Sequence, residues 1–435
     1  MKRLVAHRFA GRAVVGTIVV LLGVASLSGC GSQTSGSPTA GEVDVRQLAV
    51  GNYPTDPLDV RMSYQHSGAS GKKIALARLA DNVVIGADVD AKFSHNVLAL
   101  SLDSTNATLN SVLAGAVQPV LESNGFIFGF SAAASTRELS ASRLRDHSGN
   151  FNPFNGAASD PEATAFNVTV LQFPDQQRAQ AAADQMEAAD FAVAADQNVR
   201  VTLAKQPNAK AHWRPGVPSM AATMAYGQYV MNVYVAQPKP DLDALRGLAE
   251  QVFAGQLSLL ERAPALSPHE IFRLDYDPDA MQRRTLHPKG WLNPHPIDEA
   301  THTPRGYLHY ADDQVAWKQL LDDNGVDRIS TASSGGLLFR AHDAESAAKL
   351  WSGINSAAGA NAEAPAKVPD VSCTAKPGDE SGASWWASSV AGTSTAYVCT
   401  LHYDRYVARV AGPQLVDVQQ RAAAQYALLA NAQYM

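Results

Sequence analysis

The amino-acid sequence predicts an α+β fold made of two similar domains that arise from an internal duplication. Four short elements recur in the same order in the two halves of the 435-residue chain, and their apolar residues follow helical and strand periodicities in turn. Each half is expected to form a mainly antiparallel sheet with helices packed on one face. The domains are predicted to span residues 43–262 and 263–435, because Pro264 and Pro268 end the last helix of the first half.

The first recurring element is an amphipathic helix that ends at an Asn-Gly pair and leads into a strand. Its two copies are VLAGAVQPVLESNGFIFGF at 112–130 and QVAWKQLLDDNGVDRIST at 314–331. The Asn-Gly pairs suit a helix C-terminus, because glycine adopts the left-handed conformation freely. We therefore expect each helix to end there and a strand to follow.

The second recurring element is a strand followed by an alanine-rich helix. It is found at 166–186 and again at 335–354. In both copies an aspartate, Asp175 or Asp343, stands between the strand and the helix. Aspartate is a favoured N-cap residue, so each helix is expected to begin directly after it.

The last two recurring elements are a hairpin and the helix that follows it. AYGQYVMNV (225–233) matches HYDRYVARV (402–410), and LRGLAEQV (245–252) matches QRAAAQYA (420–427). Apolar residues alternate on both sides of the central Gly-Gln and Asp-Arg pairs, which indicates a tight turn in each hairpin. Each half is thus predicted to run helix, strand, strand, helix, strand, strand, helix.

The N-terminus has the pattern of a bacterial lipoprotein signal peptide. Basic residues precede an apolar stretch at 13–25, which is short for a stable membrane span, and the lipobox Leu-Ser-Gly-Cys ends at Cys30. We expect residues 1–29 to be removed and Cys30 to receive diacylglycerol and palmitate. The alternative is a secretory signal in which Cys30 is incidental.

The expected anchor predicts a location on the outer face of the cytoplasmic membrane, in the cell envelope. Two or three acyl chains hold a protein firmly, because each buried methylene contributes about 0.8 kcal/mol. Residues 30–42, rich in Gly, Ser and Thr, are expected to form a flexible tether. A second long apolar run is absent from the sequence, so no transmembrane helix is predicted.

Composition narrows the range of partners. The formal net charge is −6, and the chain lacks the basic footprint of nucleic-acid-binding proteins, so no nucleic-acid partner is expected. It also lacks the polybasic run that adds binding to anionic lipids. Hydrophobic residues make up 46% of the chain, which is sufficient for two cores. No cofactor is expected.

The cysteine count predicts a disulfide bond. Of three cysteines, lipidation of Cys30 leaves Cys373 and Cys399 as a pair. Disulfides persist in exported proteins, and a bridge closing a loop of this size stabilises by about 3 kcal/mol. The alternative is two free thiols.

The segment 286–310 raises the question of a metal site. It contains His287, His295, His302 and His309, at spacings of eight, seven and seven. Zinc sites favour ligands that are three to five residues apart, and the four prolines in this segment prevent a helix from aligning the imidazoles. We therefore interpret the segment as a polar connection that opens the second domain, and we keep a metal site as the minor alternative.

Catalytic motifs are incomplete in the sequence. Ser70-Gly71-Lys72-Lys73 fits the Ser-x-x-Lys pattern of penicillin-binding enzymes, but the Ser-x-Asn and Lys-Thr-Gly motifs of that class are not found at suitable spacings. The same stretch departs from a phosphate-binding loop at two required positions. We interpret it as a solvated loop followed by a helix.

Trp385 and Trp386 form a candidate contact site. They lie in the loop that the predicted disulfide would close, within the Gly/Ser-rich segment KPGDESGASWW. An exposed tryptophan pair on such a loop suits contact with a glycan, a lipid interface or a partner protein.

The sequence resembles uncharacterised lipoproteins of mycobacteria and related actinobacteria, which have paired N- and C-terminal domains of unknown function. The resemblance rests on the lipobox, the tether, YPTDP (53–57), SNGFIFGFS (123–131) and the strand–Asp–helix element. It implies an envelope location and supplies no activity or site residue. The last hairpin and helix, with the disulfide, are also similar to extracellular sensor domains of mycobacterial serine/threonine kinases, at the level of fold alone.

Three functions compete on this evidence. The sequence favours a non-enzymatic envelope lipoprotein that binds a cell-wall component, a lipid or a partner protein, because no catalytic set is recognisable. An envelope hydrolase whose residues assemble only in three dimensions is the second hypothesis. A metal-handling lipoprotein based on the four histidines is the third. The cleft between the two halves is the natural place to look for a ligand.

Overall fold

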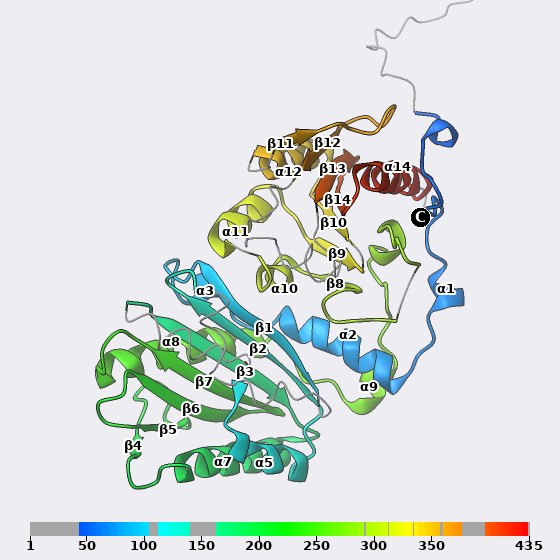
Figure 1. The fold of residues 1–435 in the computed structure, drawn as a ribbon. Coiled ribbons are helices and arrows are strands. Elements are labelled where there is room, and N and C mark those ends of the chain that lie inside the picture. The colour runs from blue at the N-terminus through cyan, green and yellow to red at the C-terminus, as the bar shows by residue number, and fades with distance from the viewer. Residues whose placement is uncertain are drawn as a thin grey trace, which may run out of the picture. The chain divides into compact units, whose positions relative to one another are not determined.

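The structure is a computed structural model, and it describes residues 43–103, 112–139, 162–290, 293–311, 313–333, 335–356, 360–375 and 396–433. Cys30, the signal peptide and the tether therefore lie outside the described residues, as do Trp385 and Trp386. Residues 43–435 form one compact unit. Two antiparallel sheets of seven strands each lie in it, one from each half of the chain (Figure 1).

The N-terminal sheet has the strand order β1-β2-β3-β7-β6-β5-β4, and every neighbouring pair is antiparallel. A tight turn joins β6 to β7, where Tyr226 pairs with Tyr229. Gly227 in this turn has a φ of +56°, which suits glycine. The strands are β1 (His95–Asp103), β2 (Phe128–Ser135), β3 (Ala165–Gln172), β4 (Val199–Val201), β5 (Lys210–Trp213), β6 (Ser219–Tyr226) and β7 (Tyr229–Ala236).

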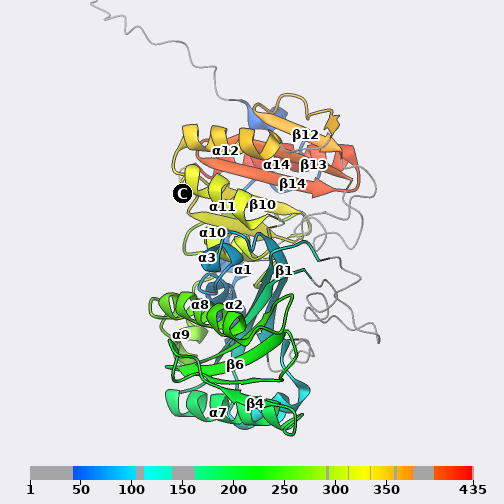
Figure 2. The same cartoon turned by 90° about the vertical axis from the view of Figure 1, so that its left-hand side faces the viewer.

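Helices cover both faces of this sheet. Phe128, Phe130 and Phe166 pack in one core with α2 and α8, whereas Ala133 and Leu171 pack in another with α5 and α7. Figure 2 shows α8 and α7 on opposite sides of β6. The helices are α1 (Val60–Ser63), α2 (Gly68–Ala80), α3 (Gly86–Val89), α5 (Gln118–Ser123), α7 (Gln176–Ala192) and α8 (Leu242–Leu260), with the short 3-10 helix η2 (Gly115–Val117) before α5.

The C-terminal sheet has the order β11-β12-β13-β14-β10-β9-β8 and is also antiparallel throughout. Tyr403 pairs with Tyr406 across the turn from β13 to β14. The strands are β8 (Ala300–His302), β9 (Arg328–Ala332), β10 (Gly336–Arg340), β11 (Ala360–Ala362), β12 (Val371–Ala375), β13 (Tyr397–Tyr403) and β14 (Tyr406–Gly412).

Helices again pack on both faces of the C-terminal sheet. Leu337 and Phe339 lie in a core with α10, α11 and α12, whereas Leu338 and Leu401 lie in a core with α14. The helices of this half are α9 (Pro268–Phe272), η3 (Gln282–Arg284), α10 (Pro304–Leu308), α11 (Gln314–Asp323), α12 (Ala344–Ser356) and α14 (Leu415–Asn431).

The predicted α+β fold with two similar, mainly antiparallel domains is confirmed, with one correction to the placement of the helices. The sequence analysis expected helices on one face of each sheet, and they pack on both. The reason is that the central strands are buried on both sides: every position of β2 and of β3 is buried. A sheet that is buried on both faces requires a helical layer on each of them.

The two sheets follow one topology. Read from β1, the N-terminal order corresponds strand by strand to the C-terminal order read from β8. The helix ends correspond as well: Asn124 donates from Nδ2 to the Val120 carbonyl at 2.9 Å, and Asn324 donates to the Leu320 carbonyl at 2.8 Å. Residues Gly125 and Gly325, which follow, have φ of +71° and +56°.

The N-caps correspond in the same way. Asp175 accepts a hydrogen bond from the Arg178 backbone N–H at 2.7 Å, and Asp343 accepts one from the Ser346 N–H at 2.8 Å. Both aspartates therefore satisfy a donor that the first turn of the following helix leaves free.

Residues 43–58 pack against the C-terminal sheet, although they precede the N-terminal sheet in the chain. Leu48 lies in the core under α14. The Tyr53 hydroxyl donates to the Asp417 carboxylate, and Asn431 donates to the Thr55 carbonyl at 2.8 Å. The N-terminal half of the chain therefore begins on the surface of the other half.

Cys373 and Cys399 form the predicted disulfide bond. They are directly opposite each other on β12 and β13, and both are buried. The prediction from the cysteine count is thus confirmed. Across the described residues, none of the helices combines the length and the apolar character that crossing a membrane requires.

Candidate functional site

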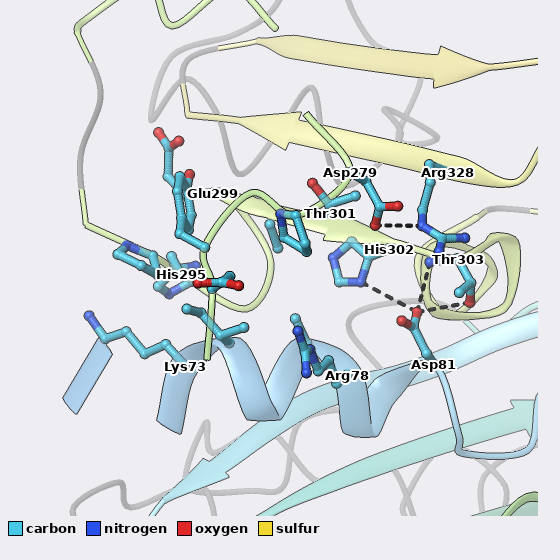
Figure 3. Close-up of a pocket in the computed structure, with 17 residues that line it drawn as sticks. Lys73, Arg78, Asp81, Asp279, His295, Glu299, Thr301, His302, Thr303 and Arg328 are labelled. Carbon is cyan, nitrogen blue, oxygen red and sulfur yellow. Dashed lines mark hydrogen bonds and ion pairs between the residues drawn. The ribbon is translucent and has the colours of Figure 1, made fainter. Parts of the chain in front are cut away.

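A cleft of about 410 Å³ lies between helix α2 of the N-terminal half and strand β8 of the C-terminal half. Figure 3 shows α2 along one side and the segment that carries Thr301 and His302 along the other. Its walls combine apolar and charged side chains, as ligand sites commonly do. The lining residues are Lys73, Ile74, Ala77, Arg78, Asp81, Asp275, Tyr276, Pro278, Asp279, Pro294, His295, Glu299, Ala300, Thr301, His302, Thr303 and Arg328.

Helix α2 is placed by its cap and its apolar face. Ser67 is the N-cap, and its Oγ accepts a hydrogen bond from the Ser70 backbone N–H at 3.0 Å. Leu76 and Leu79 pack in the core of the N-terminal sheet, which leaves the opposite side of the helix at the cleft. The stretch that the sequence analysis interpreted as a solvated loop is therefore partly helical, because Ser67 starts the helix at Gly68.

Asp81 follows α2 and caps a helix of the other half. Its Oδ1 accepts hydrogen bonds from the backbone N–H and the hydroxyl of Thr303, both at 2.9 Å. Thr303 is the N-cap of α10, so the carboxylate satisfies donors at the start of that helix. A Cβ at Gly306 would lie 2.1 Å from Asp81 Oδ1, so glycine is required for the carboxylate to approach.

Burial sets the protonation of the two titratable groups at the inner end of the cleft. Desolvation raises the pKa of Asp81 to about 7, although the Thr303 hydrogen bonds act in the opposite direction. Desolvation lowers the pKa of His302 to about 4. At neutral pH the cleft therefore contains a neutral imidazole and a partly protonated carboxyl group.

Buried polar atoms without hydrogen-bond partners gather on β8. Neither ring nitrogen of His302 makes a hydrogen bond of ordinary geometry, although the Pro296 carbonyl lies near enough to oppose the fall in the His302 pKa that burial causes. The Asp81 Oδ1 atom is 3.9 Å from His302 Nδ1. His302 is fully buried. The buried hydroxyl of Thr301 also has no partner. Such atoms are rare in folded proteins because each costs about 1–3 kcal/mol, so their concentration at one cleft indicates a place for water or a ligand.

Most charges in the cleft are paired within the protein. Arg328 Nε lies 2.8 Å from Asp279 Oδ2. The Glu299 carboxylate accepts from the Ser333 N–H at 3.1 Å, and its second oxygen lies 2.9 Å from His287 Nδ1. Arg328 and Asp279 therefore neutralise each other, whereas Glu299 keeps its negative charge unless His287 is protonated.

Lys73, Arg78 and Asp275 are different. Their charged groups make no hydrogen bond or close ion pair with any residue that the structure describes. Lys73 is half-buried, and Arg78 and Asp275 are exposed. Arg78 exerts only a longer-range attraction on the nearby Asp81 carboxylate. Two cations and one carboxylate thus line the cleft with their charges unpaired.

The four histidines of the predicted connecting segment are brought to separate environments. His295 and His302 line the cleft, and His295 Nδ1 lies 3.4 Å from Asp298. His287 pairs with Glu299, and His309 is hydrogen-bonded to the Ala80 carbonyl at 3.0 Å. Among the described residues, no three His, Cys, Asp or Glu side chains are arranged to hold a metal ion.

A second pocket, of about 520 Å³, lies in the N-terminal half beside α7, β5 and β6. His212 on its wall stands between two carboxylates: Nδ1 is 3.4 Å from Glu187, and Nε2 is 3.9 Å from Asp190. Arg200 neutralises the buried Glu187 at 3.0 Å. Burial raises the pKa of Asp190, and the attraction of His212 opposes that rise.

The sequence analysis singled out two cleft residues, His295 and His302, and missed Lys73, Arg78 and Asp81 as site residues. One local pattern pointed to Asp81: it directly follows an apolar helical stretch and precedes Asn82. Such a position predicts the end of a helix. Its partner Thr303 is more than two hundred residues away in the chain, and this pairing is set by the tertiary fold alone.

The fold and the cleft define a two-domain α+β protein with a candidate ligand site between its halves. The chain belongs to the family described as domain of unknown function DUF7373: the N-terminal family model matches residues 62–276, and the C-terminal model matches residues 281–432. The predicted resemblance to a paired-domain family of unknown function is thereby confirmed.

Two further comparisons add little. The extracellular domain of PknH from Mycobacterium tuberculosis aligns with 43% of this chain and 98% of its own length, at 14% sequence identity and a TM-score of 0.28. No curated protein sequence matches the chain.

Proposed function

We propose that the protein is a lipid-anchored extracytoplasmic binding protein, without catalytic activity, whose ligand occupies the cleft between its two halves. The ligand is a soluble or lipid-borne component of the cell envelope. The single observation that carries this proposal is the set of buried polar atoms of Thr301 and His302 on that cleft that make no hydrogen bond of ordinary geometry within the described residues. A folded protein avoids such atoms unless another molecule completes their hydrogen bonds.

The construction of the cleft supports the same proposal. One wall comes from α2, which packs on the N-terminal sheet, and the other comes from β8 of the C-terminal sheet. Sites between domains are common for ligands, since a small relative movement of the walls can admit and then enclose a molecule. Asp81 and Thr303 hold the inner end of the cleft together.

The location is supported by two features of the chain. The first twelve residues, the apolar stretch and the lipobox have the order of a lipoprotein signal. The Cys373–Cys399 bridge is of a kind that persists in oxidising compartments outside the cytosol.

The anchor gives a direct prediction for Cys30. In a bacterial host that processes lipoproteins, the wild-type chain is expected in the membrane fraction, with an N-terminal peptide whose mass includes diacylglycerol. Cys30→Ser should remove that mass and release most of the protein from the membrane, because no acyl chain can be attached. Recovery of Cys30→Ser in the membrane fraction to the same extent as wild type would contradict the proposed anchor.

Native mass spectrometry of the full chain, purified from membranes of its own type of host in mild detergent, tests the binding function. We expect an added mass that survives gentle desolvation. Thr301→Phe, which fills the cleft from β8, should abolish it. Ser219→Phe is the matched control, because Ser219 is also a half-buried hydroxyl residue on a strand but lines the second pocket.

The result that would overturn the cleft as the site is an adduct that Thr301→Phe retains. Loss of the adduct in Ser219→Phe alone would favour the second candidate function, an envelope enzyme with acid–base chemistry in the N-terminal pocket. The arrangement of His212 between Glu187 and Asp190 favours that candidate, because a carboxylate beside an imidazole orients it for proton transfer.

A further inference from the structure

We infer that the pocket of about 520 Å³ in the N-terminal half is a second ligand site, and that its ligand is an uncharged sugar. This site is independent of the proposed function, because the pocket shares no described lining residue with the cleft between the halves. Three features of the pocket indicate a sugar: hydrogen-bonding groups on its floor, apolar side chains on its wall and a balance of its charges.

The floor of the pocket is one face of the N-terminal sheet. Val230 of β7 packs with α7 in the core on that face. Asn232 and Tyr234 lie on the same face, because side chains alternate between the two sides of a strand. On β6, Ala221 is directly opposite Tyr234, so Ala221 and Ser219 share this face as well. The strand register therefore brings amide and hydroxyl groups from two neighbouring strands to the floor of the pocket.

The groups on the floor can donate and accept hydrogen bonds. Asn232 donates from Nδ2 to Thr223 Oγ1 at 2.9 Å, and its Oδ1 atom makes no hydrogen bond within the described residues. Burial raises the pKa of Tyr234, and the nearby Ser219 hydroxyl opposes that rise, so the Tyr234 hydroxyl is uncharged at neutral pH. A hydroxyl group both donates and accepts. The floor therefore matches a ligand whose own groups do both, as the hydroxyls of a sugar do.

The C-terminal sheet shows that the fold does not require hydroxyl groups at two of these positions. When the hairpins are aligned on their turns, Ser219 and Tyr234 correspond to Ala396 and Ala411. Ala411 and the directly opposite Val398 pack in a core with α12. One sheet therefore closes this face with apolar contacts, whereas the other has hydrogen-bonding groups and a pocket there.

The helical layer over this face gives the pocket an apolar wall. Met186 of α7 lines the pocket, as do Leu113 and Val117 at and before η2, and all three belong to one core. A sugar ring has hydroxyl groups at its edge and C–H bonds on its faces. Its faces can therefore contact this wall while its edge reaches the floor. A volume of about 520 Å³ is within the range of small-molecule sites and suits one or two sugar rings.

The charges at the pocket balance. Asp190 and Arg214 are the acidic and the basic residue among the described lining residues. Glu187 lies beside His212, at 3.4 Å from its Nδ1 atom, and is paired with Arg200 at 3.0 Å. With the imidazole neutral, these five groups have no net charge. A charged ligand would therefore lose its hydration without gaining a net counter-charge, whereas an uncharged ligand avoids this cost.

Saturation-transfer NMR of the full chain in deuterated detergent tests this inference. The method detects weak binding, which we expect because each hydrogen bond to the sugar replaces one to water. The probes are the methyl glycosides of D-glucose, D-galactose and D-mannose, each with its uronic acid and its amino sugar as charged matches. At least one neutral glycoside should bind, and its two charged matches should bind at least about fivefold more weakly, since their charges stay unpaired.

Two conservative variants test the floor. Ser219→Ala and Tyr234→Phe each remove one hydroxyl and change no charge, and each should weaken the bound glycoside about fivefold, as loss of a hydrogen bond does. Tyr226→Phe is the matched control. Tyr226 is also a half-buried tyrosine of this hairpin, but it packs against the core on the opposite face and does not line the pocket. Its substitution should leave the affinity unchanged.

Two bulky variants separate this site from the cleft. Ser219→Phe should abolish binding of the glycoside, and Thr301→Phe should not affect it. The reverse pattern would place the sugar in the cleft, which overturns this inference and supports the proposed function. Loss of binding in both variants, or in neither, would contradict a site confined to the pocket.

The remaining outcomes concern the ligand class. Absence of binding by all three neutral glycosides, or tighter binding of a charged match, overturns the uncharged sugar. An equal loss in Tyr226→Phe and Tyr234→Phe overturns the floor as the contact surface. A sugar held this weakly is not expected to survive purification, so the adduct in the native mass spectrum still reports on the cleft and on the proposed function alone.

Discussion

The two sheets of the protein have one topology but differ in the side chains at equivalent positions. When the hairpins β6–β7 and β13–β14 are aligned on their turns, the disulfide pair Cys373–Cys399 falls at the position of Ala211 and Ala222. Both pairs are directly opposite residues on neighbouring strands, and all four side chains are buried. The same backbone therefore accepts a covalent bond in one half and a pair of methyl groups in the other.

A second difference lies on the opposite face of the sheets. The N-terminal sheet buries a hydrogen-bonded group of Ser131, Asn167 and Thr169 on β2 and β3. The position of Thr169 corresponds to Leu337 in the C-terminal sheet. These comparisons teach that the two sheets keep the same strand order, while individual buried positions are covalent, polar or apolar in one sheet and not in the other.

The largest expected effect follows from the disulfide. Replacing both cysteines, Cys373→Ala and Cys399→Ala, gives the C-terminal sheet the residues of its N-terminal counterpart. We expect the free energy of unfolding of the C-terminal half to fall by about 3 kcal/mol, because the unfolded chain gains the freedom of the opened loop. Hydrogen exchange of strand amides, read separately for the two sheets, measures this loss.

The reciprocal change sharpens the test. Ala211→Cys with Ala222→Cys should form a second bridge, since the two positions correspond to the natural one, and it should slow exchange in β5 and β6. If the cysteine-to-alanine pair weakened both sheets equally, the two halves would not be independent in stability, and the comparison between them would fail.

The next largest expected effect concerns Asp81, whose contribution to the free energy of unfolding depends on pH. It follows α2, and the described residues between α8 and β8 include no helix of similar length, so the C-terminal half offers no counterpart. Because burial raises the pKa of Asp81 to about 7, the folded chain keeps a proton there that the unfolded chain releases above about pH 4. The contribution of Asp81 to stability is therefore lost as the pH rises from about 4 to 7.

Asp81→Asn should remove that loss and keep the cap on α10. The unfolding free energy of the variant minus that of the wild type should rise by about 2 kcal/mol between pH 4 and 7. This is roughly half of the value that the full pKa shift of Asp81 gives, because the Asp81 side chain remains 14% exposed. Burial lowers the pKa of His302 and of His309. Both histidines are present in the wild type and in the variant, so their effect on the pH dependence cancels in the difference between the two proteins. A difference that stays constant with pH, in denaturation curves, would contradict the raised pKa.

The sequence predicted the central elements of each half and missed the outer ones. Helix ends, N-caps and the central hairpins were found because Asn-Gly pairs, Asp175 and Asp343 act within a few residues of the structure they define. The outer strands β4, β8 and β11 are three residues long, too short to show a strand period. The cleft joins Asp81 to Thr303, and no local pattern encodes such a contact.

The buried polar group of the N-terminal sheet predicts a smaller effect. Asn167→Ala removes the donor to Ser131 Oγ, at 2.9 Å, and the acceptor for the Thr169 hydroxyl, at 3.1 Å. We expect a loss of about 1.5 kcal/mol, because buried partners are left unsatisfied. The triple variant Ser131→Ala, Asn167→Ala, Thr169→Val leaves no such partner and should be about as stable as the single variant. Chemical denaturation of both variants distinguishes this from simple additivity.

The smallest effect concerns the two hairpin turns. Gly227 and Asp404 occupy equivalent positions, with φ of +56° and +49°, and this left-handed region favours glycine over aspartate. Asp404→Gly should therefore stabilise the C-terminal hairpin by about 0.5 kcal/mol, after the greater freedom of glycine in the unfolded chain is subtracted. Gly227→Asp should destabilise the other hairpin by a similar amount, because a Cβ there meets no atom within 4 Å and only backbone strain changes. Denaturation midpoints that move in opposite directions would show that the halves use one turn geometry with different side chains. Movement of both in the same direction would mean that the Asp404 side chain stabilises its turn by contacts that outweigh the strain.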